Sequence, residues 1–134
     1  MPSGRTIYYP YPRIAEETRV FTNADGTRRE VVTRKMVYEG EHTKTRKWTE
    51  LRAYGGLLAE NVTQAASRDV LVDAMTRLES AGLPVILHVH DEVVCEVPST
   101  ADYAQFCDLM RRVPTWCADL PIATDGWNGA RYRK

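Results

Sequence analysis

Two adjacent carboxylates, Asp91 and Glu92, interrupt an apolar stretch of the sequence. The flanking runs, residues 85–90 and 93–97, are rich in β-branched side chains and predict two strands joined by a tight turn that carries both acids. Two-residue turns favour pairs such as Asn-Gly, so two neighbouring carboxylates are a poor choice, sterically and by mutual repulsion. We therefore expect something other than turn formation to select them.

Rigidly held carboxylates of this kind are suited to a divalent metal ion that takes part in phosphoryl transfer. Mg²⁺ prefers hard oxygen ligands and bridges to substrate phosphates. His88 and His90 precede the acids and would also be compatible with zinc, but the fuller ligand set of the usual zinc hydrolases is missing. From spacing alone, a magnesium site and an ordinary surface turn both stay open.

The elements expected next to this hairpin are two helices and a short strand. Helical propensity begins near Trp48, and apolar residues recur at helical spacing through residues 57–81, before a Gly-Leu-Pro sequence ends the run. A second helix is expected to start within residues 99–102 and to stop before Pro114, and a last short strand is expected over residues 120–124. The long helix is the element most able to hold the hairpin in place.

One stripe of the long helix changes character along its length. Polar side chains gather around Gln64 on a helical wheel: Glu60, Asn61, Ser67 and Arg68. Apolar side chains continue the same stripe further on: Leu71, Met75 and Leu78. We expect the first half to face water or a polar ligand and the second half to lie in a core.

The first third of the chain is predicted to be extended. Two β-rich runs, residues 18–22 and 28–38, flank an Asn-Ala-Asp-Gly-Thr sequence and predict a projecting hairpin. A short strand is expected over residues 6–9, and a polar loop over residues 40–47.

Composition excludes several classes of protein. The chain has 134 residues, 43% of them hydrophobic, which is too apolar for intrinsic disorder, and it has no apolar run long enough to span a membrane. No secretory segment is recognised and the three cysteines lack metal or redox spacing, so we expect a cytoplasmic protein. The zero net charge hides +4 over residues 1–52, −7 over residues 53–130 and +3 over the last four residues.

Several motifs resemble, in the right order, the C-terminal part of the palm of family A DNA polymerases, in particular phage-type ones. The most specific is Val-His-Asp-Glu at residues 89–92, which resembles motif C, preceded by Glu-Asn-Val-Thr-Gln-Ala at residues 60–65. The others are Pro-Ser-Gly-Arg at residues 2–5 with Tyr-Tyr-Pro at 8–10, Trp48 with Tyr-Gly-Gly at 54–56, and Gly-Trp at 126–127 with the basic end at 131–134. The resemblance runs over nearly the whole chain.

This resemblance implies a role for each matching residue. Asp91 would ligate the catalytic Mg²⁺ with help from Glu92, and His90 would lie near the primer terminus. Gln64 would touch the duplex in the minor groove. DNA contacts are also implied by this comparison for the following residues: Asn61, Arg68 and Arg5.

Arg68 also has a simpler interpretation as an ion-pair partner of an acid on its own helix: Asp69, Glu60 or Asp73. The basic residues of the expected N-terminal hairpin, a phage-type insertion, would either follow phosphates or be solvated.

The resemblance also implies that essential parts lie elsewhere. Two-metal phosphoryl transfer needs carboxylates from two separate chain segments, and nothing here resembles the motif A aspartate or the fingers helix that holds the triphosphate. Three explanations stay open. The chain is one subunit of a split polymerase completed by an upstream polypeptide, an inactive or DNA-binding remnant, or an unrelated metal-dependent phosphodiesterase or nuclease.

The predicted fold is α+β, with a small antiparallel sheet packed on a long helix in a palm-like subdomain. We expect residues 1–47 to form the N-terminal strand and projecting hairpin, and residues 48–134 to form the palm-like part. The complete enzyme would bind primer–template DNA and dNTP. An isolated chain is expected to expose apolar sheet surface and to self-associate.

Overall fold

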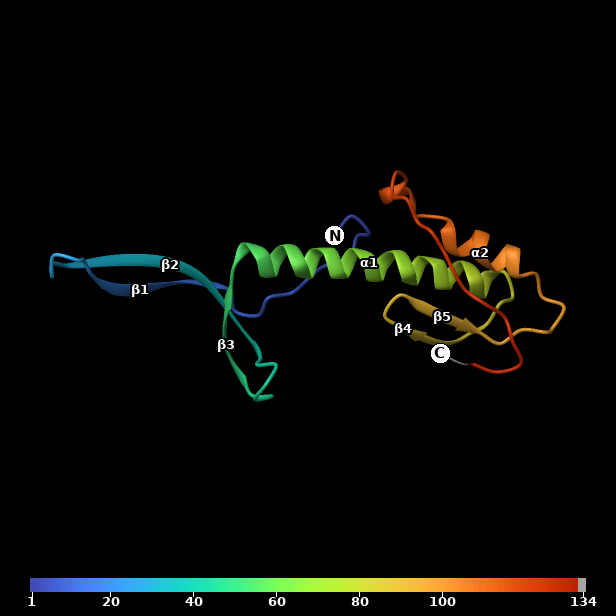
Figure 1. Ribbon diagram of the computed structural model, residues 1–134, viewed down its shortest axis with the longest axis horizontal. Helices are drawn as coiled ribbons and strands as arrows, with labels where there is room; N and C mark the ends of the chain where they lie inside the picture. The colour runs from blue at the N-terminus through green and yellow to red at the C-terminus, as the bar shows by residue number, and fades with distance from the viewer. Residues whose placement is uncertain (133–134) are drawn as a thin grey trace. The chain divides into compact units, whose positions relative to one another are not determined.

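A computed structural model describes residues 1–132 of the chain (Figure 1). Its elements in chain order are β1 (Arg13–Thr22), β2 (Arg28–Glu41), β3 (Trp48–Ala53), α1 (Gly55–Ser80), β4 (Val85–Val89), β5 (Glu92–Cys95), α2 (Tyr103–Arg111) and the short 3₁₀ helix η1 (Thr115–Cys117). β1, β2 and β3 form one antiparallel sheet, and β4 and β5 form another. The α+β class is confirmed.

The described residues group into two compact units. The first holds Met1–Arg5 and the chain from Thr63 onward, and the second holds Thr6–Val62. The expected division between residues 47 and 48 falls within the second unit and stays a prediction about domains. Within the described residues, no helix is both long and apolar enough to cross a membrane.

The predicted N-terminal hairpin is confirmed as β1 and β2. They pair in register from Arg13 opposite Val37 to Thr22 opposite Arg28. In the connecting loop the backbone amide of Thr27 donates to the Asp25 carboxylate at 2.9 Å, an Asx-type turn. Gly26 adopts a φ of 83°, which costs a residue without a Cβ little. That this hairpin projects from the protein stays a prediction.

β3 replaces the expected start of the long helix. Trp48 pairs with Glu41 and Thr49 with Gly40, so the sheet takes up residues that we expected in a loop or a helix. Aromatic and β-branched side chains favour such a strand, and the free edge of β2 supplies its hydrogen bonds. α1 therefore begins only at Gly55.

The predicted end of the long helix is confirmed. α1 ends at Ser80, Gly82 takes a φ of 76°, and the backbone amide of Leu83 donates to the carbonyl of Leu78 at 3.0 Å. This is the hydrogen-bond pattern of a glycine-terminated helix. The Glu79 carboxylate then accepts from the backbone amide of Val85 at 2.7 Å, which fixes the first residue of β4 to the helix.

The core of the first unit joins α1, α2 and the β4–β5 hairpin. Leu78, Leu83 and Leu109 are buried. Partly buried side chains packed against them come from both strands and from α2: Val85, Val93, Cys95, Phe106 and Met110. Figure 1 shows β4 and β5 side by side along the C-terminal half of α1. The expected packing of this hairpin on the long helix is confirmed.

Two expected strands are wrong. Residues 6–9 and 120–124 form no strand. Pro121 lacks a backbone donor for a ladder, and Leu120 is exposed rather than covered by a neighbour. In the first segment the Tyr9 ring packs edge-on against Tyr38 at 5.1 Å, so side-chain contacts, not strand pairing, hold it.

Candidate functional site

The turn between β4 and β5 contains His90 and Asp91. Val89 pairs with Glu92, so Glu92 is the first residue of β5. The expectation that both acids lie in the turn is therefore wrong for Glu92. His90 takes a φ of 52° in the left-handed region, which is uncommon for a residue other than glycine. Backbone strain of this kind gathers at functional sites.

The two carboxylates differ in their surroundings. Asp91 is exposed in the turn, whereas Glu92 is half-buried in β5. The Tyr132 hydroxyl donates to Oε2 of Glu92 at 3.3 Å, across 40 residues of sequence. Partial burial raises the pKa of the Tyr132 hydroxyl, and the neighbouring Glu92 carboxylate adds to this rise. Sequence reasoning missed this contact, because it considered Tyr132 only as part of a basic end that resembles the phage-type C-terminus.

The carboxylate pair fits part of a magnesium site. Mg²⁺ is commonly held by one or two protein carboxylates together with substrate phosphates. Asp91 and Glu92 supply that number of carboxylates from adjacent positions. Over residues 1–132 no three His, Cys, Asp or Glu side chains gather closely enough to hold an ion by themselves. A complete site would need further ligands from substrate or from another chain segment.

Arg68 links the polar half of α1 to the strand that leads into this turn. Its two terminal nitrogens lie 3.2 Å from the two ring nitrogens of His88 in β4. A neutral imidazole has a single acceptor nitrogen and a guanidinium only donates, so one of these contacts is a hydrogen bond and the other a close approach. Arg68 thus lies toward the hairpin that carries Asp91.

The acids expected as partners of Arg68 include two that bind other residues. The structure pairs Asp73 with Arg77 and Asp69 with Arg5. The interpretation of Arg68 as an ion-pair partner of these two acids is therefore wrong. Helical spacing allowed Arg77 as well as Arg68 as the partner of Asp73 and could not choose between them. It also could not place Arg5 beside Asp69, because the two are 64 residues apart.

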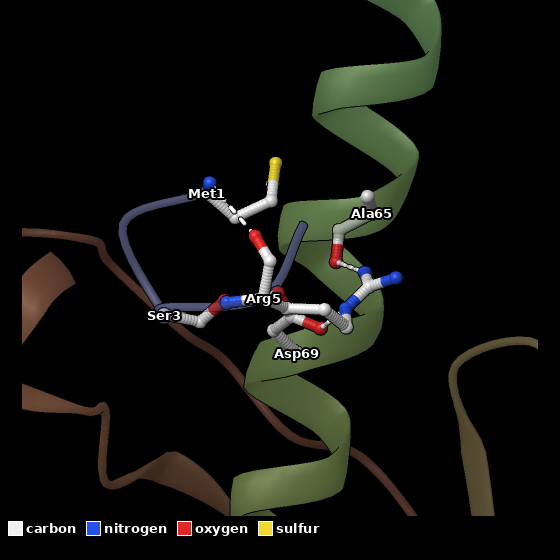
Figure 2. Close-up of polar contacts among 5 residues, drawn as sticks. All are labelled: Met1, Ser3, Arg5, Ala65 and Asp69. Carbon is white, nitrogen blue, oxygen red and sulfur yellow. Dashed lines mark hydrogen bonds and ion pairs between the residues drawn. The ribbon is translucent and has the colours of Figure 1, made fainter. Parts of the chain in front are cut away.

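Arg5 is bound to α1 at the level of Ala65 and Asp69 (Figure 2). Its Nε donates to Oδ1 of Asp69 at 2.6 Å, and a terminal nitrogen donates to the Ala65 carbonyl at 2.9 Å. Ser3 donates to the other oxygen of Asp69 at 2.5 Å. The Ser3 hydroxyl and the Arg5 guanidinium lower the pKa of Asp69, against a desolvation effect that raises it.

The remaining expected DNA contacts lie on the first turns of α1. Gln64 is exposed, one turn before Arg68 on the same helix. Asn61 belongs to the second unit, where its side-chain amide donates to the Tyr9 hydroxyl at 2.9 Å. The first unit therefore brings Arg5, Gln64 and Arg68 to one stretch of helix, and Asn61 is held by a different neighbour.

The chain is similar to a DNA polymerase of Bacillus phage SP02. The two are 33% identical over 135 residues, which is the whole of this chain and 19% of the phage protein. The chain therefore spans less than a fifth of the relative that it matches. No protein-family profile and no solved structure matches the chain. The similarity supports a fragment of a phage-type DNA polymerase.

Proposed function

We propose that the chain is the C-terminal palm portion of a family A DNA-directed DNA polymerase. The observation that carries the proposal is the β4–β5 turn, where a left-handed His90 precedes Asp91 on a hairpin packed against α1. A two-residue hairpin turn needs a positive φ, which glycine or asparagine usually supplies, so a histidine followed by an aspartate at this place indicates selection for something other than turn formation. The polymerase relative supplies the class of chemistry. In this proposal the turn is motif C.

Asp91 and Glu92 are proposed to hold the catalytic Mg²⁺ of nucleotidyl transfer. When bound, the ion polarises phosphoryl oxygens and neutralises charge on them. Asp91 is the exposed ligand, and Glu92 is the half-buried one that Tyr132 contacts. His90, fixed by the strained turn, is proposed to lie at the primer terminus.

The polar stretch of α1 is proposed to contact primer–template DNA. Gln64 is exposed and would reach a base edge in the minor groove, where recognition is tolerant of sequence. Arg68 would approach the sugar–phosphate backbone while His88 holds it toward the hairpin. Arg5 and Asn61 complete the expected set, with Arg5 acting from its position on Asp69.

The proposed activity requires further polymerase segments, and no segment of this chain resembles them. A second carboxylate segment, motif A, and cationic side chains for the dNTP triphosphate are proposed to come from an upstream polymerase polypeptide. The chain is then one part of a split polymerase. An inactive or DNA-binding remnant and an unrelated metal-dependent nuclease are the competing outcomes of the experiment below.

Primer extension distinguishes these outcomes. The chain alone is expected to leave a labelled primer unextended, and the product of the reading frame immediately upstream is expected to restore Mg²⁺-dependent extension. Asp91→Asn is expected to abolish the restored activity. The matched control is Asp102→Asn, because Asp102 caps α2 and asparagine caps a helix equally well.

Three results would contradict the proposal. Extension by the chain alone would remove the need for an upstream part. Absence of rescue by the upstream product would favour the remnant. Phosphodiester cleavage by the isolated chain with Mg²⁺ or Zn²⁺ would favour the nuclease.

A further inference from the structure

The chain returns from α2 to the β4–β5 hairpin at its C-terminal end. Tyr132 donates from its hydroxyl to Oε2 of Glu92 at 3.3 Å. Both residues belong to the first unit, and Glu92 directly follows Asp91. Nothing in the local sequence of β5 provides this donor, because the two residues are 40 positions apart.

The contact with Tyr132 affects how the Glu92 carboxylate can bind a cation. An ionised carboxylate has two oxygens and about four lone-pair positions, and it only accepts hydrogen bonds. A phenol bound to Oε2 leaves Oε1 available as a cation ligand and limits rotation of the group. Donors that bind the outer oxygens of metal-ligating carboxylates orient them and strengthen metal binding.

We propose that Tyr132 is a positioning residue that orients the Glu92 carboxylate for a divalent cation held with Asp91. The inference rests on the proposed function, in which these two acids bind Mg²⁺. It goes beyond that function by assigning a role to Tyr132, to which neither spacing nor resemblance assigned one. Tyr132 acts through Glu92 and needs no contact with the ion.

The test compares three variants of the 134-residue chain by NMR. Tyr132→Phe removes the hydroxyl and keeps the ring. Tyr8→Phe is the matched control, since Tyr8 is 82% exposed and belongs to the other unit. Glu92→Gln removes the proposed ligand itself.

The first measurement needs no metal. The ¹³Cδ resonance of Glu92 and the order of its side chain are expected to change in Tyr132→Phe and to stay the same in Tyr8→Phe. Backbone amide resonances of the core report that each variant is folded. An unchanged Glu92 resonance in a folded Tyr132→Phe chain would overturn the proposal.

The second measurement uses Mn²⁺ as a paramagnetic probe. In the parent chain, broadening is expected at Asp91 and Glu92, and Tyr132→Phe is expected to weaken the binding about tenfold, in line with other lost outer contacts. A stronger binding in this variant would overturn the proposal and make Tyr132 a competitor of the ion. If Mn²⁺ broadens neither acid in the parent chain, the two acids do not hold a cation by themselves and the proposed cation-positioning role is overturned for this chain, while the metal-free measurement still reports whether Tyr132 orders Glu92.

Discussion

The two hairpins of this chain differ in what stabilises them. The β1–β2 hairpin pairs at ten positions and ends in a loop whose Asp25 and Gly26 fit their backbone roles. Cross-strand ion pairs join its arms, Arg34 with Glu16 and Lys35 with Glu17. Local chemistry explains the whole of this hairpin.

Local pairing and turn residues explain less of the β4–β5 hairpin. It pairs at only four positions, with an irregularity between Val85 and Leu87, and it turns on a left-handed His90. Its strands are instead held by the core around Leu78. A hairpin with unfavourable turn residues depends on its tertiary contacts to offset the strain, and here Val85, Val93 and Cys95 supply them by packing on the core.

The largest effect is expected in the core beneath the second hairpin. Leu78 has no exposed surface, so Leu78→Ala should lower the free energy of unfolding by about 2–5 kcal/mol. Val20→Ala in β1, where the side chain is 56% exposed, should change it by less than about 0.5 kcal/mol. Urea unfolding followed by circular dichroism measures both, and equal losses would contradict the difference in support.

The next effect concerns the turn of the first hairpin. Gly26 has a φ of 83° and open space around it, so Gly26→Ala should destabilise the hairpin by about 1–2 kcal/mol through backbone strain alone. The change is measured as a lower unfolding midpoint. A neutral result would mean that this loop adapts its backbone at no cost.

A substitution in the turn of the second hairpin should stabilise the protein, whereas Gly26→Ala destabilises it. His90→Gly relieves a φ of 52° and should raise the free energy of unfolding by about 1 kcal/mol. Under the proposed function, the same change should slow primer extension by the reconstituted enzyme. A variant that is both more stable and fully active would argue against strain kept for function.

The smallest effect is a pH dependence on α1. The pKa of Asp69 is lowered in the folded chain, first by Ser3 and then by Arg5, so the ionised carboxylate favours folding above its unfolded pKa. This contribution is lost as the pH falls through the lower, folded pKa. Asp69→Asn should remove that part of the acid dependence in unfolding curves measured between about pH 6 and pH 2. An unchanged acid profile would contradict the pairing.

Sequence patterns predicted the elements that rest on local chemistry. Four predictions are confirmed: the first hairpin, the glycine-terminated end of α1, the start of α2 directly after residues 99–102, and the packing of β4 and β5 on the long helix. β3 was missed because its partner is the free edge of β2, and residues 120–124 were misjudged because nothing pairs with them. Strand formation there depends on neighbours, which propensity does not describe.

The sequence predicted which residues belong to the candidate site, but it did not predict the contacts that they make. Asp91, Glu92 and Gln64 could be found from spacing and resemblance, and their roles stay predictions. The contacts of Arg68 with His88 and of Tyr132 with Glu92 join segments 20 and 40 residues apart. Such pairs follow from the tertiary fold and have no periodic signal in the sequence.

The central claim is that Asp91 belongs to the metal-binding motif of a DNA polymerase. The most direct measurement is the initial rate of Mg²⁺-dependent primer extension by the chain combined with its upstream polypeptide, compared between the parent chain and Asp91→Asn. The account predicts that this variant loses at least about 100-fold in rate, as expected when an electrostatic contact to the reacting phosphate is removed. An Asp91→Asn rate equal to that of the Asp102→Asn control would contradict it.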